Sequence, residues 1–382
     1  MSMINIVEVR TAGQMRAFVR FPLVLYKNCP QYVPAIYADE KNLRNPKKNP
    51  NLVDCEVHCF LAYRDGKIAG RIAAIEQKAY NRISGRKCLR FSRFDCVDDS
   101  EVAKALFAAV EKLGREKGLD TLHGPWGFDD MDREGMLTEG FGYRATYATN
   151  YNYEYYEKLV TFLGFSSESE WVEYEFDMPD KVDERIAHVA AYISKKMGVC
   201  EQAESLPMKQ LIAKYGHAAL EMVNLAYAKL DCYVPVHGKI IDQVLRQFAT
   251  VINPRYFSLL TDKEGEVAAM AVVLPSICKP LQKSGGRMTL PTIFRLVKAI
   301  GKSKELEMVL IAVHPKYQKM GLNSVMMSRI IANIIQDKIE RVESNPELVS
   351  NTAVQEQWNA MGRRIIKRRK TFIRPIGGSD GK

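Results

Sequence analysis

The residues whose types and spacing most clearly indicate a binding site form a loop, Gln318-Lys-Met-Gly321, between an apolar run and a helical pattern. The run Leu306–Val313 predicts a buried strand, and apolar residues recur at helical spacing from Leu322 onward. A glycine at such a junction lets a ligand approach the backbone, and the free amides and dipole at a helix start attract anions. The spacing therefore indicates a phosphate site, while an ordinary strand-to-helix turn that binds nothing is the alternative.

The elements that would hold this loop occur twice along the chain. Two strand–turn–strand patterns with aspartate and glycine in the turn cover residues 58–77 and 255–277, and each is followed by another strand and a helix. A polar stretch around Pro179 separates the two copies. We therefore predict an α+β fold of two similar halves, residues 1–178 and residues 179–382.

Composition places the chain among globular proteins with sizeable cores. It has 382 residues, 47% of them hydrophobic and 26% charged, which excludes a mostly disordered, collagen-like or disulfide-stapled chain. No apolar run reaches the roughly 18 residues of a membrane span, and Glu8 and Arg10 near the start argue against a secretory signal. Cys55, His58 and Cys59 lack a second ligand pair at zinc spacing, so we expect no metal, and reduced thiols in the cytoplasm. The net charge of +10 favours an anionic partner: a phosphorylated cofactor, a membrane surface or nucleic acid.

The segment from Val309 to Asn323 resembles the acyl-CoA motif of GNAT acyltransferases, an apolar strand followed by Gln/Arg-x-x-Gly-x-Gly/Ala, although Asn323 replaces the usual small residue. The resemblance implies two fused GNAT-like halves, each a central mixed β-sheet flanked by helices. It also implies that the loop amides hold the pyrophosphate of acyl-CoA and that the strand backbone pairs with its pantetheine arm. The residues assigned to coenzyme A in this way are Ile311, Val313, Gln318, Lys319, Met320, Gly321, Leu322 and Asn351.

Two further comparisons with the GNAT pattern concern proton transfer and the first half. Asn351, Trp358 and Gly362 fall at the family spacing Asn-x6-Tyr-x3-Gly. The family tyrosine often protonates the departing thiolate, and an indole cannot play that role. In the first half, Asp98 and Asp99 stand where a pyrophosphate would need positive potential. We therefore expect the first half to be a degenerate GNAT half that does not bind coenzyme A.

The resemblance extends over nearly the whole chain. Pieces such as Gly124-Pro125 and Tyr155-Tyr156 resemble a bacterial family of tandem GNAT proteins that includes the bacterial ceramide synthases. This resemblance implies an N-acyltransferase that moves an acyl group from acyl-CoA directly to an amine, in that branch a long-chain, sphingoid-like base. A Fem-type aminoacyl transferase is an alternative, but the sequence lacks the heptad pair of its usual helical arm. The second alternative is a non-catalytic GNAT relative that binds lipid or nucleic acid. Trp358 and Asn323 are compatible with it because they depart from the pattern of the catalytic family.

An amine must be neutral to attack a thioester, so we expect a general base. Glu343 follows the coenzyme A helix on a strand where its side chain would face the cleft, and Glu307 begins the preceding strand. His237 precedes the second hairpin and could take a proton near neutral pH. Each of the three could instead be a surface or turn residue without a catalytic role.

Two segments of the chain are rich in lysine and arginine and could contact an anionic partner. Lys279–Lys304 contains seven Lys/Arg and no acid, and Pro291 and Gly301 can start and stop a helix inside it. Such a basic amphipathic helix suits an anionic surface, so we predict a peripheral contact with the inner membrane face; a helix packed on its own domain is the alternative. The run Arg363–Arg374 predicts a last strand with a basic face, which we do not expect to bind nucleic acid. The residues on the apolar face of the predicted helix are Ile293, Leu296, Val297 and Ile300.

Overall fold

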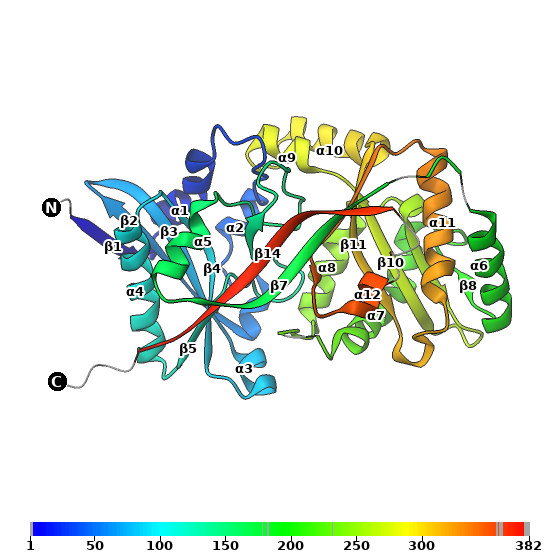
Figure 1. The fold of residues 1–382 in the computed structure, drawn as a ribbon, viewed down its shortest axis with the longest axis horizontal. Coiled ribbons are helices and arrows are strands. Elements are labelled where there is room, and N and C mark those ends of the chain that lie inside the picture. Colours follow the sequence, from blue (N-terminus) through cyan, green and yellow to red (C-terminus); the bar gives the residue numbers. More distant parts are fainter. Residues whose placement is uncertain are drawn as a thin grey trace.

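The computed structural model describes residues 3–177, 179–181, 183–230, 232–356, 358 and 362–377. Within these residues the strands form one continuous 14-stranded sheet with helices on both faces (Figure 1). The predicted α+β class is thereby confirmed. The predicted boundary falls on residue 178, which lies outside the described residues, and it stays a prediction.

The sheet runs in the order β1-β2-β3-β4-β5-β14-β7-β12-β11-β10-β9-β8, with β6 beside β14 and β13 beside β7. The strands are β1 (Ile4–Glu8), β2 (Cys55–Arg64), β3 (Lys67–Gln77), β4 (Cys88–Cys96), β5 (Thr121–Gly124), β6 (Met136–Glu139), β7 (Ser166–Phe176), β8 (Cys200–Glu201), β9 (Phe257–Thr261), β10 (Val267–Pro275), β11 (Glu305–Val313), β12 (Arg341–Ser344), β13 (Glu347–Leu348) and β14 (Arg363–Pro375).

The helices that cover this sheet include three short 3-10 turns. They are α1 (Ala12–Leu25), α2 (Tyr37–Lys41), η1 (Pro50–Val53), α3 (Lys78–Ser84), α4 (Ser100–Glu116), α5 (Tyr155–Phe162), α6 (Glu184–Met197), α7 (Met208–Tyr227), α8 (Lys239–Ala249), η2 (Pro254–Tyr256), α9 (Cys278–Ser284), α10 (Leu290–Lys302), η3 (Pro315–Tyr317), α11 (Leu322–Gln336) and α12 (Thr352–Glu356).

The same pairing pattern occurs twice. The hairpins β2/β3 and β9/β10 are antiparallel, β3/β4 and β10/β11 are antiparallel, and β4/β5 and β11/β12 are parallel. Asp65 and Gly66 turn the first hairpin with φ of 50° and 76°, a left-handed conformation that suits these residue types. Both predicted hairpins are confirmed, and so is the strand–loop–helix predicted from Leu306 to Asp337, which the structure forms from β11 and α11.

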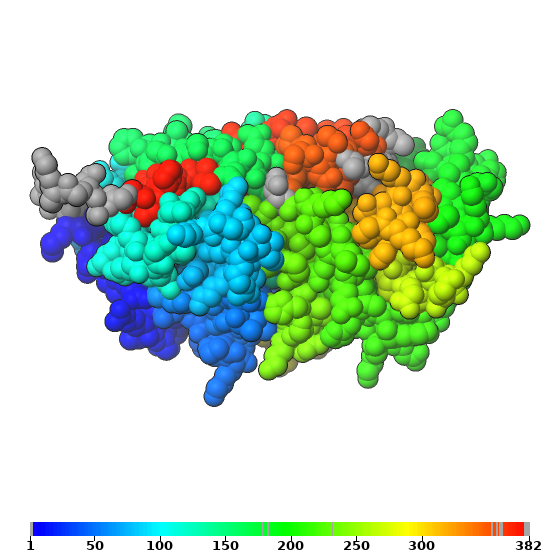
Figure 2. All heavy atoms as spheres, turned by 90° about the horizontal axis from the view of Figure 1, so that it is seen from below, coloured from blue at the N-terminus to red at the C-terminus, as the bar shows by residue number. Residues whose placement is uncertain are grey.

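The two repeats exchange their final strands. The last strand, β14, lies between β5 and β7, and β7 in turn pairs with β12 of the second repeat. The ladder between β7 and β14 runs from Phe176–Arg363 to Ser166–Ile373. The resemblance implied a central mixed sheet in each half, and the structure joins the two into one sheet, because the exchange pairs the otherwise open edges of β5 and β12. Figure 2 shows the joined halves from below, with blue-to-cyan residues on one side and green-to-orange residues on the other.

Alternating side chains of each strand feed cores on the two faces of the sheet, as the two-residue period of a strand requires. In β2, Phe60 and Ala62 belong to the core under α4, whereas Cys59 and Leu61 belong to the core under α1. In the second repeat α11 and α7 take these two positions. No helix in the described part of the chain has the length and apolar character needed to cross a bilayer.

Candidate functional site

The loop between β11 and α11 has the features of an anion site. Gly321 takes φ of 84° directly before Leu322, and it provides no side-chain cap for the first turn of the 15-residue helix. The first turn also contains no acidic residue, and Lys319 and Met320 are exposed beside it. The amides and positive dipole end of α11 are therefore open to an external anion. Of the residues assigned to coenzyme A, Gln318 to Leu322 thus lie together at this helix start.

The matching junction of the first repeat is closed by its own side chain. At the start of α4 the Asp99 carboxylate accepts hydrogen bonds from the amides of Glu101 (3.1 Å) and Val102 (3.3 Å). A carboxylate of the chain thus takes the position that an external phosphate would need. This geometry supports the expectation that the first half does not bind coenzyme A.

Strand β11 separates from β12 beyond a short paired stretch. The two strands pair only from Glu305–Arg341 to Met308–Ser344. Beyond this point the Ile311 carbonyl accepts a hydrogen bond from the Tyr227 hydroxyl at 2.9 Å, and the Val313 carbonyl accepts one from the Gln318 side chain at 3.3 Å. The two residues assigned to pantetheine therefore present their carbonyls to side chains rather than to β12.

A cavity of about 1000 Å³ lies where the two repeats meet. One wall is the separated part of β11, with Val309, Leu310 and Ile311, and the loop 129–134 of the first repeat forms the opposite wall. Of the residues assigned to coenzyme A, Ile311 and Asn351 line this cavity, whereas Val313 and the loop before α11 lie outside its lining. A third wall, from α10, is apolar (Ile293, Leu296, Val297, Ile300), whereas α8 contributes both apolar (Ile240, Val244, Phe248) and polar side chains (Gln243, Arg246, Gln247).

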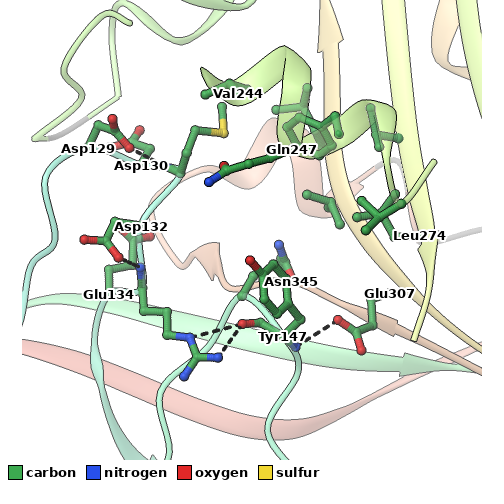
Figure 3. A pocket seen from close by; sticks show the side chains of 18 of the residues that line it. Asp129, Asp130, Asp132, Glu134, Tyr147, Val244, Gln247, Leu274, Glu307 and Asn345 are labelled. Atoms are coloured by element: carbon green, nitrogen blue, oxygen red, sulfur yellow. Dashed lines mark hydrogen bonds between the residues drawn. The ribbon is translucent and has the colours of Figure 1, made fainter. Parts of the chain in front are cut away.

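Carboxylates gather at the first-repeat wall of the cavity (Figure 3). Burial, with the Asp132 charge adding, raises the pKa of Asp129 to about 6, and burial next to Asp129 raises that of Asp130 to about 7. Burial also raises the pKa of Glu134, whose Oε2 has no hydrogen-bond partner among the residues that the structure describes. Asp132 differs, because the Arg93 guanidinium at 2.8 and 3.0 Å outweighs burial and lowers its pKa. The wall thus combines three carboxylates whose pKa is raised, although the charge of Arg90 opposes the shift, with one that is paired to Arg93.

Glu307, one of the three proposed bases, also lines this cavity. Its Oε2 accepts a hydrogen bond from the Tyr147 amide at 3.0 Å (Figure 3). Its Oε1 accepts one from the Cys278 thiol at 3.2 Å. His237 is half exposed and lies outside the cavity lining, where its Nε2 contacts Asp54 of the first repeat at 2.5 Å. The structure therefore brings Glu307 to the cavity and leaves His237 at a surface contact between the repeats.

Glu343 lies in a buried ion network instead of in the cavity wall. Its carboxylate contacts Lys367 of β14 and accepts a hydrogen bond from Arg341 at 2.7 Å. Lys367 also pairs with Glu173 at 3.0 Å. Burial raises the pKa of Glu343, the Lys367 and Arg341 charges oppose that shift, and the Glu173 charge adds to it. Its placement differs from the predicted one because β14 comes to lie next to β7 and fills the space that the side chain would face.

We expect Glu343→Gln to destabilise the fold by about 3 kcal/mol, because it leaves Lys367 buried with one carboxylate in place of two. The midpoint of urea unfolding measures this. The control is Glu340→Gln, an exposed carboxylate close by in the chain, which should change stability by less than about 0.5 kcal/mol. A variant with normal stability but lost turnover would instead establish Glu343 as the predicted base.

Trp358, which stands at the position of the family tyrosine, is buried and donates a hydrogen bond from its indole to Glu347 at 2.9 Å. Burial raises the pKa of Glu347 to about 7, although that bond opposes the shift. Both residues line the cavity beside Asn351. A tyrosine hydroxyl is nevertheless present at this cavity, because Tyr227 reaches it from the end of α7.

Sequence reasoning missed Asp129, Asp130, Glu134 and Tyr227. A signal was present for three of them, because four carboxylates occur within the six residues 129–134. Tyr227 had none, since it ends an ordinary amphipathic helix. In the described residues no group of three or more histidine, cysteine and acidic side chains is arranged to hold a metal ion.

Comparisons with known proteins show which sequences and solved structures this chain resembles. No known protein-family model matches the chain. The chain is 25% identical over 292 residues, 75% of its length and 73% of the relative's, to a protein named bacterial ceramide synthase from Caulobacter vibrioides. It is also 30% identical over 129 residues, 34% of the chain and 33% of the relative, to protein YghO of Escherichia coli.

Solved structures align over the whole chain. A tandem GNAT protein from the clavulanic acid biosynthesis pathway aligns with 99% of this chain and 100% of its own at a TM-score of 0.57 and 12% identity. A GCN5-related N-acetyltransferase from Sphaerobacter thermophilus aligns with 98% of this chain and 96% of its own at 0.51 and 10%. The protein thus has the tandem GNAT fold, and its sequence is similar to that of a bacterial ceramide synthase.

Proposed function

We propose that this protein is an N-acyltransferase that moves an acyl group from acyl-CoA directly to the amine of a long-chain, sphingoid-like base. The observation that carries the proposal is the cavity between the repeats, which joins the separated strand β11 to a carboxylate wall, to an apolar wall from α10 and to apolar side chains of α8. An amphiphilic amine matches that pattern, because carboxylates stabilise its ammonium group and apolar walls take up its hydrocarbon chain. The similarity to a protein named bacterial ceramide synthase supports the same substrate class.

The residues present fit a coenzyme A thioester in the second repeat. The start of α11 suits the pyrophosphate, and β11 beyond its pairing with β12, at Ile311 and Val313, suits the pantetheine arm. Bound there, the thioester would supply the acyl carbonyl that the amine attacks. The nitrogen–carbon bond forms, the carbon–sulfur bond breaks, and the proton released from nitrogen passes to a carboxylate. We assign that proton to Asp130, because a base with a pKa near the working pH is the most effective.

The proton for the departing thiolate is assigned to Tyr227. Its hydroxyl lies at the Ile311 carbonyl, on the strand that would hold pantetheine, and a phenol carries its proton at neutral pH. Trp358 cannot provide this proton.

We expect Tyr227→Phe to lower turnover of an alkyl thioester about tenfold, a modest loss because thiols ionise near pH 8.5 and leave with little help. The measurement compares that donor with an aryl thioester, whose thiolate needs no proton and whose turnover should be unaffected. Equal losses with both donors would mean that Tyr227 only shapes the cavity.

The proposed function is tested by incubating the purified protein with acyl-CoA and a set of amines: a long-chain base, a short polar amine and a lysine peptide. We expect N-acylated long-chain base by mass spectrometry, with one free thiol released per product. Thiol release that follows the short amine or the peptide would overturn the lipid-like acceptor.

Parallel reactions address the two alternatives. Transfer from aminoacyl-tRNA would favour the Fem-type function, and a protein that binds acyl-CoA without transferring to any amine would be the non-catalytic relative. We further propose that the reaction takes place in the cytoplasm, where acyl-CoA is available, with the protein resting on the inner membrane face.

A further inference from the structure

The segment α9–α10 (residues 278–302) has an unusual surface. Five large apolar side chains within ten residues are exposed: Met288 at 41%, Leu290 at 74%, Ile293 at 46%, Phe294 at 77% and Val297 at 66%. A cluster of this kind on a protein surface marks an interaction site rather than ordinary scatter.

Basic side chains flank this apolar cluster. Arg295, Lys298 and Lys302 of α10 are all exposed and have no carboxylate as a neighbour within the segment. At 100° per residue, Leu290, Phe294 and Val297 share one side of the helix, and the three cations lie next to them. Apolar side chains bordered by long cationic ones form the surface of a helix that lies in the plane of an anionic bilayer.

The side of α10 that faces away from the three cations belongs to the cavity. Leu296 and Ile300 pack against the core below the helix and line the cavity. Ile293 and Val297 line the cavity as well although they are exposed, so the cavity wall reaches the molecular surface at α10. The predicted apolar stripe is therefore divided, with one part turned into the protein and the other toward solvent.

The segment is also held by both repeats, which fixes it over the cavity. The side-chain amide of Gln282 donates to the carbonyls of Pro30 (2.7 Å) and Tyr32 (2.9 Å), and the Gly286 carbonyl accepts from the Tyr37 amide at 2.9 Å. On the other side, Asn253 donates to the Ile300 carbonyl at 3.2 Å. Figure 1 shows α9 and α10 along one edge of the molecule, bridging the two repeats.

We propose that α10 docks the protein on an anionic lipid bilayer and forms the wall through which a membrane-embedded long-chain amine passes into the cavity. The docking follows from the exposed apolar and basic side chains alone, and the passage of the amine rests on the proposed function. The positive charge of the helix favours a phospholipid surface with negative headgroups. The exposed apolar side of α10 adjoins the side that lines the cavity, and this connects the bilayer surface to the cavity.

The docking is tested by flotation of the full chain with vesicles of phosphatidylcholine alone or with 30% phosphatidylglycerol added. We expect binding to the anionic vesicles that weakens as salt rises, because salt screens the attraction. Replacing Arg295, Lys298 and Lys302 by glutamate should weaken it at least about 100-fold, since each cation near an anionic bilayer contributes roughly 1 kcal/mol. The matched control replaces Lys67, Lys104 and Lys158, three exposed lysines of the first repeat, by glutamate and should bind almost as well as wild type.

The apolar contribution is tested separately with Phe294→Ser, which should weaken vesicle binding by about 10-fold or more. Its control is Phe162→Ser on α5, where the phenylalanine is 68% exposed but lies far from α10 in the chain, and this variant should bind like wild type. A wild-type protein that ignores anionic vesicles at low salt, or controls that lose binding as strongly as the α10 variants, would overturn the docking.

The passage of the amine is tested with the same α10 variants in the acyl transfer reaction. They should lose rate with a long-chain amine presented in anionic vesicles but keep it with a short-chain analogue in solution. Equal rates with both amines would overturn the passage at α10. If no amine is acylated by the wild type while flotation behaves as expected, the proposed function fails and the docking surface stands.

Discussion

Replacing Gly321 by glutamate should abolish binding of coenzyme A, which the wild type should bind at one site per chain. A carboxylate about 4 Å from a pyrophosphate charge near a protein surface costs about 4 kcal/mol, or roughly 1000-fold in affinity. Gly321 also has φ of 84°, where any side chain is strained, and its added Cβ would lie 2.5 Å from the Cδ1 atom of Ile193. Isothermal titration calorimetry measures both the affinity and the stoichiometry.

Gly321→Ala separates charge from shape in this experiment. It introduces the same Cβ and the same backbone strain without a carboxylate, so it should weaken binding much less than glutamate does. A second control, Gly118→Glu, places the same residue at another glycine with positive φ, which has open space around it and lies far along the chain from the loop. Two binding sites per chain, or normal affinity in a folded Gly321→Glu variant, would remove the loop before α11 from the donor site.

Replacing Asp130 by asparagine should lower kcat by about 10²–10⁴, the usual contribution of a general base. The carboxylate accepts a proton only when it is ionised, and burial next to Asp129 raises its pKa to about 7. The wild-type rate should therefore increase as pH rises toward 7 and level off above it, and the variant should lose this dependence. A stopped assay of N-acylated product across pH 5.5 to 9 measures the profile.

The effect on kcat and on KM distinguishes the base from a residue that only binds the ammonium group. A pure binding residue would raise KM for the amine and leave kcat unchanged. Asp39→Asn is the matched control, since Asp39 is an exposed carboxylate at the same cavity and should leave the rate nearly unchanged. Full turnover with an unchanged pH profile in Asp130→Asn would transfer the role to Glu134 or Glu307.

The local elements of this protein could be predicted because their signals lie in neighbouring residues. The turn at Asp65-Gly66 follows from the conformational preferences of two adjacent residues, and the strand and helix around Gly321 follow from contiguous apolar periods. Helix α10 was predicted between Pro291 and Gly301 on the same basis, and it extends from Leu290 to Lys302. The difference between the two helix starts, with glycine before Leu322 and acidic residues at Asp98 and Asp99, could be predicted for the same reason.

Tertiary structure alone decided which of these groups meet. The carboxylates at 129–134 and the strand residue Ile311 are about half the chain apart, and they line one cavity only because the two repeats exchange β7 and β14. The same exchange brings Lys367 against Glu343 and so turns a proposed base into a member of a buried ion network. The helical spacing of the apolar residues in α10 predicts that one side of the helix is apolar. The packing of both repeats beneath the helix determines which part of that side is covered. Strand pairing and packing are set by the sum of many contacts between distant residues, and no short stretch of the sequence carries that information.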